Sequence, residues 1–432
     1  MKIVICGAGG RDFHVFNVLY RDDEETEVVC FTAAQIPHID SRTYEVAGAR
    51  YPSGIPIRPE AELETIVEEN DVDEVVFAYS DVREEYLHAL QKRVEPLGAR
   101  FTAFDPGLTM LDPPRPCVAI CAVRTGCGKS GVSRYVARVL RECGLRVAAI
   151  RHPMPYGALT EERAVQRFVS EADLVAQDCT IEEREEYEPH LDAGNLVYAG
   201  IDFERIAAAA AEEVDVLVWD GGNNDTPFYR PDMLVTLVDP LRPGDELTYF
   251  PGRWNLEHAD IVVIAKSEMA TEEALETVRG NISKVNPGAM VVDGSSPIDI
   301  AGEDLGGKRV LVVEDGPTVT HGGMGYGAGY IAATRAGAEI VDARPHAVGG
   351  IAEAFENYPH LEKVLPAIGY APEDLADLEE SIRHAECDAV IIGTPSDITK
   401  LLAIEQPTVR VTYRFEERDG TALADRVRET FC

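Results

Sequence analysis

The run Arg124-Thr125-Gly126-Cys127-Gly128-Lys129-Ser130, with Gly131 after it, has the residue types that hold the phosphates of a nucleotide. Gly126 and Gly128 permit a tight turn whose backbone N–H groups point inward, toward an anion. Lys129 supplies a positive charge for the β- and γ-phosphates, and Ser130 supplies a hydroxyl ligand for Mg²⁺. The whole run, Arg124 to Gly131, is therefore predicted to bind a nucleoside triphosphate with Mg²⁺, and Lys129 is a predicted catalytic residue.

The elements around this run are those that a phosphate loop requires. An apolar stretch, Cys117–Val123, is typical of a buried strand, and a helical pattern runs from Lys129 to Cys143. One position departs from the strict pattern, which has a glycine five residues before the Gly-Lys pair where this chain has Val123. The flanking strand and helix still favour phosphate binding.

A nucleotide site of this kind also needs a carboxylate at the end of a neighbouring strand to hold Mg²⁺. Asp220 follows the apolar run Val214–Trp219 and opens the glycine-rich turn 221–225. We predict that Asp220 is catalytic and that it and Ser130 hold the metal ion. A helix cap is the alternative role for Asp220, and Asp225 is a second candidate.

The base of the nucleotide is predicted from the residues that follow a later strand. Guanine-specific phosphate-loop proteins usually have Asn-Lys-x-Asp there, whereas this chain has Ala265-Lys266-Ser267-Glu268. The stem of Lys266 can cover a base and Glu268 can accept a hydrogen bond from it, but the asparagine is missing. We therefore expect ATP and keep GTP as the alternative.

Two further glycine loops flank the phosphate loop. The first, at residues 7–12, follows a strand and opens a helix, but Asp12 replaces the last glycine of a dinucleotide-binding pattern. NAD, a substrate phosphate and a purely structural turn remain open for it. The second, at residues 314–329, also has a strand before it and a helix after it. From these two loops we predict substrate contacts by Gly9, Gly10, Arg11, Thr320, His321, Gly322 and Gly323.

The order of strand and helix patterns predicts an α/β protein of three units. The first unit, 1–112, is a Rossmann-like α/β domain, and a proline-rich linker, Leu111–Pro116, follows it. The second, 113–300, is a P-loop nucleotide-binding domain with a parallel sheet and helices on both faces. The third, 301–432, is a C-terminal α/β domain. Strands are predicted at 2–6, 28–31, 74–79, 100–104, 117–123, 146–150, 214–219, 233–238, 260–265, 309–313, 339–341, 389–392 and 408–412. Helices are predicted at 12–20, 61–69, 84–94, 129–143 and 422–430.

Composition narrows the classes of protein that this chain can belong to. The net charge is −36, and the acidic residues lie along the whole chain, the densest run being Glu182–Glu186. This pattern predicts a solvated acidic surface and a halophilic source, and it disfavours nucleic-acid binding. No apolar run is long enough for a bilayer and no secretory signal is visible, so we expect a cytoplasmic protein. A homodimer stays open, because nothing in the sequence specifies the oligomeric state. The nine cysteines form no metal-ligand pattern and are expected to be free thiols.

With these motifs assembled, the chain resembles an archaeal family of P-loop proteins described as predicted GTPases or as relatives of cyclic 2,3-diphosphoglycerate synthetase. The resemblance covers most of the chain and rests on residues 7–14, 124–130, 220–225 and 314–318. It implies ATP-driven closure of a phosphoanhydride in a small phosphorylated metabolite. Such a substrate needs a basic pocket, for which the candidates are Arg11, Arg124, Arg151, His152, Arg253 and His321.

Two other functions stay open beside this ligase chemistry. One is a GTPase switch or a metallocentre-assembly NTPase, in which hydrolysis drives a conformational change. The other is a non-catalytic regulator that senses a nucleotide or a metabolite.

Overall fold

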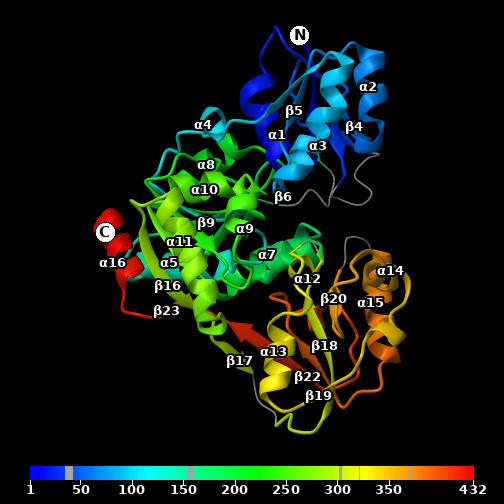
Figure 1. The fold of residues 1–432 in the computed structure, drawn as a ribbon, viewed down its shortest axis with the longest axis vertical. Coiled ribbons are helices and arrows are strands. Elements are labelled where there is room, and N and C mark those ends of the chain that lie inside the picture. Colours follow the sequence, from blue (N-terminus) through cyan, green and yellow to red (C-terminus); the bar gives the residue numbers. More distant parts are fainter. Residues whose placement is uncertain (35–41, 153–158, 301–303, 321, 369–371) are drawn as a thin grey trace.

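Three α/β units follow one another along the chain in the computed structural model. The structure describes residues 1–34, 42–152, 159–300, 304–320, 322–368 and 372–432. In Figure 1 the first unit lies at the top, the second in the middle and the third at the lower right. Helices lie on both faces of mainly parallel sheets, so the predicted fold class is confirmed.

The first unit has a six-stranded sheet in the order β3-β4-β2-β1-β5-β7. Its strands are β1 (Lys2–Cys6), β2 (Glu27–Ala33), β3 (Thr43–Tyr44), β4 (Ile55–Pro59), β5 (Glu74–Phe77) and β7 (Arg100–Ala103). Its helices are α1 (Arg11–Val15), α2 (Leu63–Asn70), α3 (Glu84–Val94) and α4 (Pro106–Thr109). The helix predicted over 12–20 is split, because Phe16–Tyr20 forms a π-helical turn.

The middle unit has a nine-stranded sheet in the order β10-β11-β9-β12-β8-β13-β15-β16-β23. Its strands are β8 (Cys117–Ala122), β9 (Val147–Arg151), β10 (Gln166–Phe168), β11 (Leu196–Ala199), β12 (Val216–Asp220), β13 (Met233–Val238), β15 (Ile261–Ile264), β16 (Met290–Ser295) and β23 (Glu416–Glu417). Its helices are α5 (Lys129–Glu142), α6 (Glu171–Ala176), α7 (Ile181–Asp192), α8 (Phe203–Ala211), α9 (Asp245–Thr248), α10 (Gly252–His258), α11 (Glu272–Val285) and α16 (Ala422–Phe431). Every residue of β8, β12 and β13 is buried, because helices cover both faces of the sheet.

The third unit has a smaller sheet in the order β17-β22-β21-β18-β19, in which β20 also pairs with β18. Its strands are β17 (Ile298–Ile300), β18 (Arg309–Asp315), β19 (Glu339–Ile340), β20 (Leu365–Ala367), β21 (Ala389–Ile392) and β22 (Thr408–Tyr413). Its helices are α12 (Gly316–Val319), α13 (Ala328–Arg335), α14 (Gly349–Asn357) and α15 (Pro372–His384).

A short ribbon joins the first unit to the middle one. In it, β6 (Val82–Arg83) pairs antiparallel with β14 (Tyr249–Phe250). The ribbon places the segment just before β6 beside the phosphate loop, where Asp81 contacts Thr125. The first unit thus takes part directly in shaping the nucleotide site.

The end of the chain leaves the third unit and returns to the middle one. The apolar residues of α16, among them Leu423 and Val427, join the same core cluster as Val132 and Val136 of α5. Residues 416–431 therefore differ from the predicted third domain, 301–432, because α16 buries its apolar side on the middle sheet. Figure 1 shows α16, in red, beside α5 and far from α13 to α15.

This return brings two cysteines together. Cys143 follows α5 and Cys432 ends the chain, and the two form a disulfide with their Cα atoms 6.0 Å apart. The expectation that all cysteines are free thiols is therefore wrong for this pair. The expectation stands for the buried thiols Cys6, Cys30, Cys117, Cys121 and Cys127.

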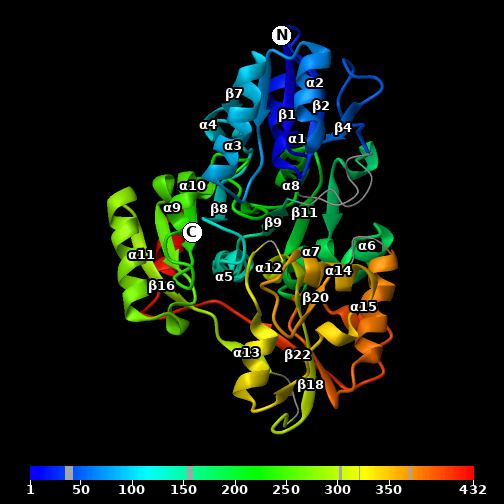
Figure 2. The ribbon, with the colours of Figure 1, turned by 45° about the vertical axis from the view of Figure 1, so that its right-hand side comes forward.

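Helix α7 lies between the middle and third units and was not expected from the sequence. Thr180 caps it by accepting from the backbone N–H of Glu183, whose carboxylate accepts from Thr180 N. Ile181 joins the core of the third unit, while Tyr187 packs on Phe168 of β10. Figures 1 and 2 both place α7 against α12.

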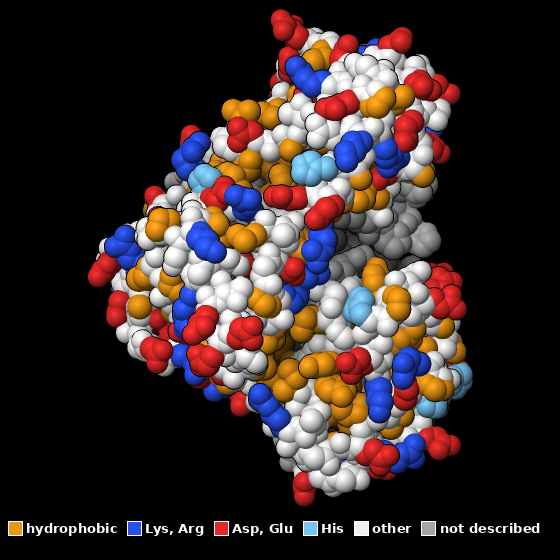
Figure 3. All heavy atoms as spheres, viewed as in Figure 1, with side chains coloured by type: hydrophobic (Ala, Val, Ile, Leu, Met, Phe, Trp, Pro, Cys, Tyr) orange, Lys and Arg blue, Asp and Glu red, His pale blue; other side chains and the backbone are white. Residues whose placement is uncertain are grey.

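The acidic run 182–186 belongs to α7, and most of it is buried. Glu182, Glu183 and Glu185 are 3%, 3% and 6% exposed. The expectation that this run forms part of a solvated surface is wrong. Elsewhere, acidic side chains are spread over the face shown in Figure 3, with arginine and lysine between them.

Among the described residues, none of the helices combines the length and the apolar composition that crossing a bilayer demands.

Candidate functional site: an interdomain cleft at the phosphate loop

The phosphate loop leads from buried strand β8 into the first turn of α5. Gly126 and Gly128 have φ angles of 80° and 98°, which side chains with a Cβ rarely adopt. Lys129 and Ser130 follow at the N-terminus of α5, and both line a cleft between the middle and third units. The loop therefore has the backbone shape and the helix N-terminus that phosphate binding requires.

Val123, which replaces the first glycine of the strict motif, is close-packed. Its carbonyl oxygen accepts a hydrogen bond from Asn224 Nδ2 at 3.0 Å. Gly252 lies so near that a Cβ there would be 2.0 Å from the Val123 oxygen. The side chain of Val123 joins the apolar core, and Gly252 is the residue whose backbone packs closely on Val123.

Polar groups from two other segments hold the loop. Lys129 Nζ donates to the backbone oxygen of Asn223, and burial lowers the pKa of this lysine. Thr125 Oγ1 donates to Asn223 Oδ1 at 2.9 Å, and Thr125 N donates to Asp81 Oδ1 at 3.0 Å. Asp81 comes from the first unit, so its carboxylate is a contact that phosphate-loop spacing alone does not reveal.

Asp220 ends β12, the strand beside β8, and is fully buried. Arg151 Nη1 lies 2.7 Å and His190 Nε2 lies 2.9 Å from Asp220 Oδ2. Burial alone would raise the pKa of Asp220, but Arg151 and His190 overcome it and hold the pKa below its ordinary value. Asp220 is therefore a carboxylate at neutral pH.

The predicted Mg²⁺ ligands, Ser130 and Asp220, fit a divalent ion. Asp220 Oδ1 receives no hydrogen bond from the described residues, so one carboxylate oxygen is left over. Within the described ranges no three His, Cys, Asp or Glu side chains gather around a metal position. Such a cluster is not needed, because Mg²⁺ keeps several waters and takes one or two carboxylates together with nucleotide phosphates. The assignment of the two ligands stays a prediction.

The residues predicted to meet the base lie on one side of the phosphate loop. Lys266 Nζ donates to Gly126 O at 2.6 Å and lies 3.2 Å from Asp239 Oδ2. Glu268 Oε1 accepts from Ser296 N at 2.9 Å. Lys266 therefore contacts the loop, whereas Glu268 holds a turn between β16 and β17.

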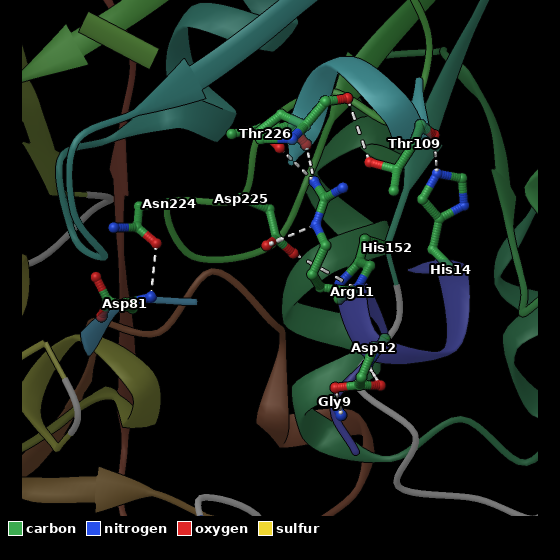
Figure 4. Close-up of polar contacts among 12 residues, drawn as sticks. Gly9, Arg11, Asp12, His14, Asp81, Thr109, His152, Asn224, Asp225 and Thr226 are labelled. Atoms are coloured by element: carbon green, nitrogen blue, oxygen red, sulfur yellow. Dashed lines mark hydrogen bonds and ion pairs between the residues drawn. The ribbon is translucent and has the colours of Figure 1, made fainter. Parts of the chain in front are cut away.

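The first glycine loop binds a carboxylate of its own chain. The amides of Gly9 and Gly10 donate to Asp12 at 2.8 and 3.0 Å, as Figure 4 shows for Gly9. Burial raises the pKa of Asp12 to about 6, against the effect of these amides. Asp12 replaces the last glycine of the dinucleotide-binding pattern. Its carboxylate accepts from the loop amides that would otherwise be free to bind the anion of a ligand.

Arg11 of the same loop is buried at the junction with the middle unit. Its guanidinium donates to Thr226 Oγ1 at 2.8 Å and lies 3.5 Å from Asp225 Oδ1 (Figure 4). His152 Nε2 lies 3.6 Å from the other oxygen of Asp225, and burial lowers the pKa of this histidine to about 4. Arg11 therefore contacts Asp225 across the junction of the first and middle units. Asp225 was the second candidate for a metal ligand.

The loop of the third unit also surrounds a carboxylate of its own chain. Glu314 accepts from the amides of Gly327, Gly329 and Tyr330 at 3.0, 3.2 and 2.7 Å. Burial raises the pKa of Glu314 to about 7. These amides, at the N-terminus of α13, are therefore already occupied.

The residues predicted for substrate contact in this loop lie in the turn that precedes α13. The amides of Thr320, Gly322 and Gly323 donate to backbone oxygens of the same turn. Gly322 O accepts from Arg242, which also donates to Thr125 O at 2.8 Å. The turn thus reaches the phosphate loop through Arg242. His321 lies outside the described residues, and substrate contact by this turn stays a prediction.

The wall of the cleft opposite the phosphate loop is acidic. Helix α7 contributes Glu185 and Glu186, and the end of β18 contributes Glu314 and Asp315. Burial, assisted by Asp315, raises the pKa of Glu185 well above its ordinary value. Glu186 pairs with Arg151, which also contacts Asp220. Carboxylates and phosphate-binding cations therefore face one space.

The basic residues nominated for a polyanionic substrate do not converge on this space. Among the described members of that set, only Arg151 lines the cleft. Arg124 pairs with Asp245, and Arg253 pairs with Glu257 on the surface. The phosphate loop and the third unit's loop border one cleft, whereas the first glycine loop lies at the junction with the first unit.

Sequence reasoning missed residues in the cleft and beside it. Asp239 comes directly after β13 and Asp220 ends β12, so the same strand-end signal could have found Asp239. Asp239 binds Arg242 and Lys266, and so holds both beside the loop. The only sequence feature that pointed to Glu185 was the acidic run 182–186, and we expected that run on the surface.

Comparison with known proteins gives two relatives. The chain is 53% identical over 432 residues to arginine synthetase ArcE of Thermococcus kodakarensis, covering 99% of this chain and 96% of the relative. It is 22% identical over 265 residues to cyclic 2,3-diphosphoglycerate synthetase of Thermococcus sibiricus, covering 57% and 59% of the two chains. The predicted resemblance to the second is confirmed as a distant one, and the first is the more similar of the two.

No profile of a known protein family matches the chain. Among solved structures, LpxK of Aquifex aeolicus in complex with ATP aligns with a TM-score of 0.46 and 13% identity, covering 81% of this chain and 97% of LpxK. The likeness is too weak to support a statement about function.

Proposed function

Because the chain belongs to the family of arginine synthetase ArcE, we propose that it is a synthetase that uses ATP to form arginine. As a member of this family the chain is an enzyme of the synthetase class. The finer assignment, arginine as product and ATP as energy source, is the proposal argued below.

The observation that carries the proposal is the opposite charge of the two walls of one cleft. Lys129, Lys266 and the amides of the phosphate loop favour a triphosphate on one wall. Glu185 and Asp315 lie on the other, where they favour a cationic nitrogen group. Arginine carries such a group, the guanidinium, at the end of its side chain.

The chemistry of arginine formation indicates the role of ATP. Arginine differs from its ureido analogue, citrulline, by a nitrogen in place of the ureido oxygen. That oxygen leaves a carbon poorly unless ATP first activates it by transfer of a phosphoryl or an adenylyl group. We assign the γ-phosphate of ATP this role: it is transferred to the ureido oxygen, ammonia then forms the new C–N bond, and the C–O bond breaks with release of phosphate.

The overall reaction consumes one citrulline, one ammonium and one ATP. It forms one arginine, one ADP, one phosphate and one proton. The chain's own residues act by position and charge. Lys129 neutralises the transferred phosphoryl group, and the loop amides orient it. Mg²⁺, when held by Ser130 and Asp220, adds charge neutralisation on the β- and γ-phosphates.

The polyanionic substrate that the family resemblance implies is the second candidate. Its support is the distant similarity to cyclic 2,3-diphosphoglycerate synthetase. It needs cations beyond those that bind the nucleotide. Three arginines line the cleft, but Arg151 is already paired with Asp220 and Glu186, and Arg414 with Asp299 and Glu416, which leaves Arg134 among the described lining residues. A substrate with several phosphates would also face Glu185 and Asp315, so we rank this function below arginine synthesis.

The test is product analysis with a panel of substrates. Purified protein is incubated with Mg²⁺, ATP or GTP, and either citrulline with ammonium or 2,3-diphosphoglycerate. We expect arginine, ADP and phosphate in equal amounts from ATP, citrulline and ammonium, with lower rates from GTP. A cyclic product seen by phosphorus NMR would support the second candidate, and nucleotide hydrolysis without either product would support a switch.

A further inference from the structure

The acidic wall holds a pair of carboxyl groups that the phosphate chemistry does not use. Glu185 lies on α7 of the middle unit and Asp315 lies at the end of β18 of the third. Glu185 is 6% exposed, and both residues line the cleft that contains Lys129 and Ser130. The pair therefore spans the two units and faces the place where nucleotide and substrate meet.

The hydrogen bonds of the pair leave it acceptor-rich. Thr394 Oγ1 donates to Glu185 Oε1, and Thr318 Oγ1 donates to Asp315 Oδ2. Glu185 Oε2 is buried and receives no hydroxyl or N–H donor from the described residues, and the carboxyl groups of Glu185 and Asp315 are hydrogen-bonded to each other. A buried oxygen of this kind is costly unless a ligand supplies the donor.

The charge around the pair is consistent with a cation that binds beside the two groups. Burial raises the pKa of both carboxyl groups. Asp315 raises the pKa of Glu185 further, whereas the hydrogen bond with Glu185 lowers that of Asp315. Glu314, the next carboxyl group along β18, is satisfied by three amides of α13 and offers nothing more. Arg151, a cation at the end of β9 that lines the same cleft, is held by Glu186 and Asp220. The described residues thus give the pair two hydroxyl groups but no cationic partner.

We propose that Glu185 and Asp315 form the site of the nitrogen donor: they bind ammonium in the cleft, and Glu185 takes its proton to give the ammonia that attacks. This rests on the proposed function, because it names the donor site of that same reaction.

The step balances without a further reactant. An N–H bond of ammonium breaks and the proton moves to Glu185 Oε2. The freed electron pair of ammonia forms the C–N bond to the phosphorylated ureido carbon, and phosphate leaves with the electrons of the C–O bond. Glu185 later releases its proton to solvent, which is the one proton of the overall balance. Ammonium has the four donors that an acceptor-rich pocket requires, and it is small enough to stand beside a bound substrate.

The test compares Glu185→Gln and Asp315→Asn with Glu183→Gln in the intact protein. Glu183 is a buried carboxyl group of the same helix, but it caps α7 and does not line the cleft. Glutamine keeps an acceptor for the Thr180 amide, so Glu183→Gln removes the same charge away from the site. Steady-state kinetics are measured with ammonium and, separately, with hydroxylamine, which is already neutral at neutral pH and needs no base.

We expect Glu185→Gln to lower kcat/KM for ammonium about 100-fold, as for loss of a general base, and to leave KM for ATP unchanged. Hydroxylamine should restore much of the rate in Glu185→Gln, because it attacks without losing a proton first. Asp315→Asn should raise KM for ammonium, and Glu183→Gln should change neither parameter.

Two failures are distinguishable. If the wild type forms arginine but Glu185→Gln keeps its kcat/KM for ammonium, or loses activity equally with hydroxylamine, the donor site is wrong and the proposed function stands. If the wild type forms no arginine from either nitrogen donor, the proposed function fails and the donor site fails with it. Thermal stability of each variant, with and without ADP, separates a misfolded protein from a specific loss. If Glu185→Gln misfolds, the Asp315→Asn variant provides the test. An unchanged KM for ammonium in Asp315→Asn would overturn the proposed donor site.

Discussion

Replacing Arg151 by methionine tests how the buried charges beside the phosphate loop are arranged. Arg151 is 2% exposed, and its guanidinium lies 2.7 Å from Asp220 Oδ2, while Asp220 is fully buried. Methionine fills much of the space but leaves Asp220 with His190 as its closest remaining contact. Breaking a buried pair by removing one partner costs about 3–5 kcal/mol of stability, and we expect a loss in this range for Arg151→Met at neutral pH.

The dependence on pH has a definite sign. With Arg151 present, the pKa of Asp220 lies below its ordinary 3.8. The pair therefore stabilises the fold above about pH 4, and this contribution is lost as pH falls through the folded-state pKa. Without Arg151, burial dominates and raises the pKa of Asp220. The deficit of Arg151→Met should then be largest at neutral pH and shrink as the solution becomes acidic.

The structure offers a local probe for this measurement. The chain has two tryptophans, and Trp219 precedes Asp220 in β12 and is fully buried. In a Trp254→Phe background, the fluorescence of Trp219 during urea denaturation reports the middle unit. Arg253→Met is the control, because its pair with Glu257 is exposed and worth about 0.5 kcal/mol.

A double-mutant cycle separates the pair from other effects of the substitution. Asp220→Asn in the Arg151→Met background removes the stranded charge, so the double variant should recover about 2 kcal/mol relative to additivity. The argument is refuted if Arg151→Met costs no more than the Arg253→Met control. It is also refuted if the costs of the two single changes simply add.

Three further predictions concern other parts of the fold. Cys143→Ser should lower stability by about 3–5 kcal/mol, because the disulfide closes a long loop; wild-type melting should then depend on a reductant, and melting of the variant should not. Gly128→Ala and Gly144→Ala both place a Cβ at a positive φ with no atom within 4 Å, so each should cost about 1–2 kcal/mol. Only Gly128→Ala should also weaken ATP binding in calorimetry, and equal affinities in the two variants would contradict the role of the loop. Burial raises the pKa of Glu314 from 4.5 to about 7. The third unit should therefore lose stability as pH rises through that interval, by about 3 kcal/mol. Glu314→Gln should flatten this dependence of the melting temperature, and an unchanged slope would contradict it.

The fold was largely predictable because its strands are buried on both faces. Met233–Val238 is a continuous apolar run, and it was predicted as a strand with the bounds that β13 has. Helix α7 could not be found in this way. Apart from Ile181 and Tyr187, its buried residues are charged or histidine, and Pro189 lies inside it. Such a helix forms because neighbouring units supply partners for its charges, and those partners are far away in sequence.

The phosphate loop was predictable because its chemistry requires neighbouring residues in a fixed order. The roles of the two flanking glycine loops were not. Amides that can bind a ligand's anion can equally bind a carboxylate of the same chain, and Asp12 and Glu314 fill both places. The aspartate three positions after Gly9 was the signal for the first loop. The acidic wall was beyond sequence reasoning, because Glu185 and Asp315 meet only through the packing of α7 on the third unit.

The central claim is that the nucleotide in this cleft activates a ureido oxygen so that nitrogen can replace it. The most direct measurement uses citrulline labelled with oxygen-18 in its ureido group, with ATP, Mg²⁺ and ammonium. The account predicts that each arginine formed is accompanied by one phosphate that carries the label, as read by mass spectrometry. Arginine accompanied by unlabelled phosphate, or labelled citrulline left intact while ATP is consumed, would contradict it.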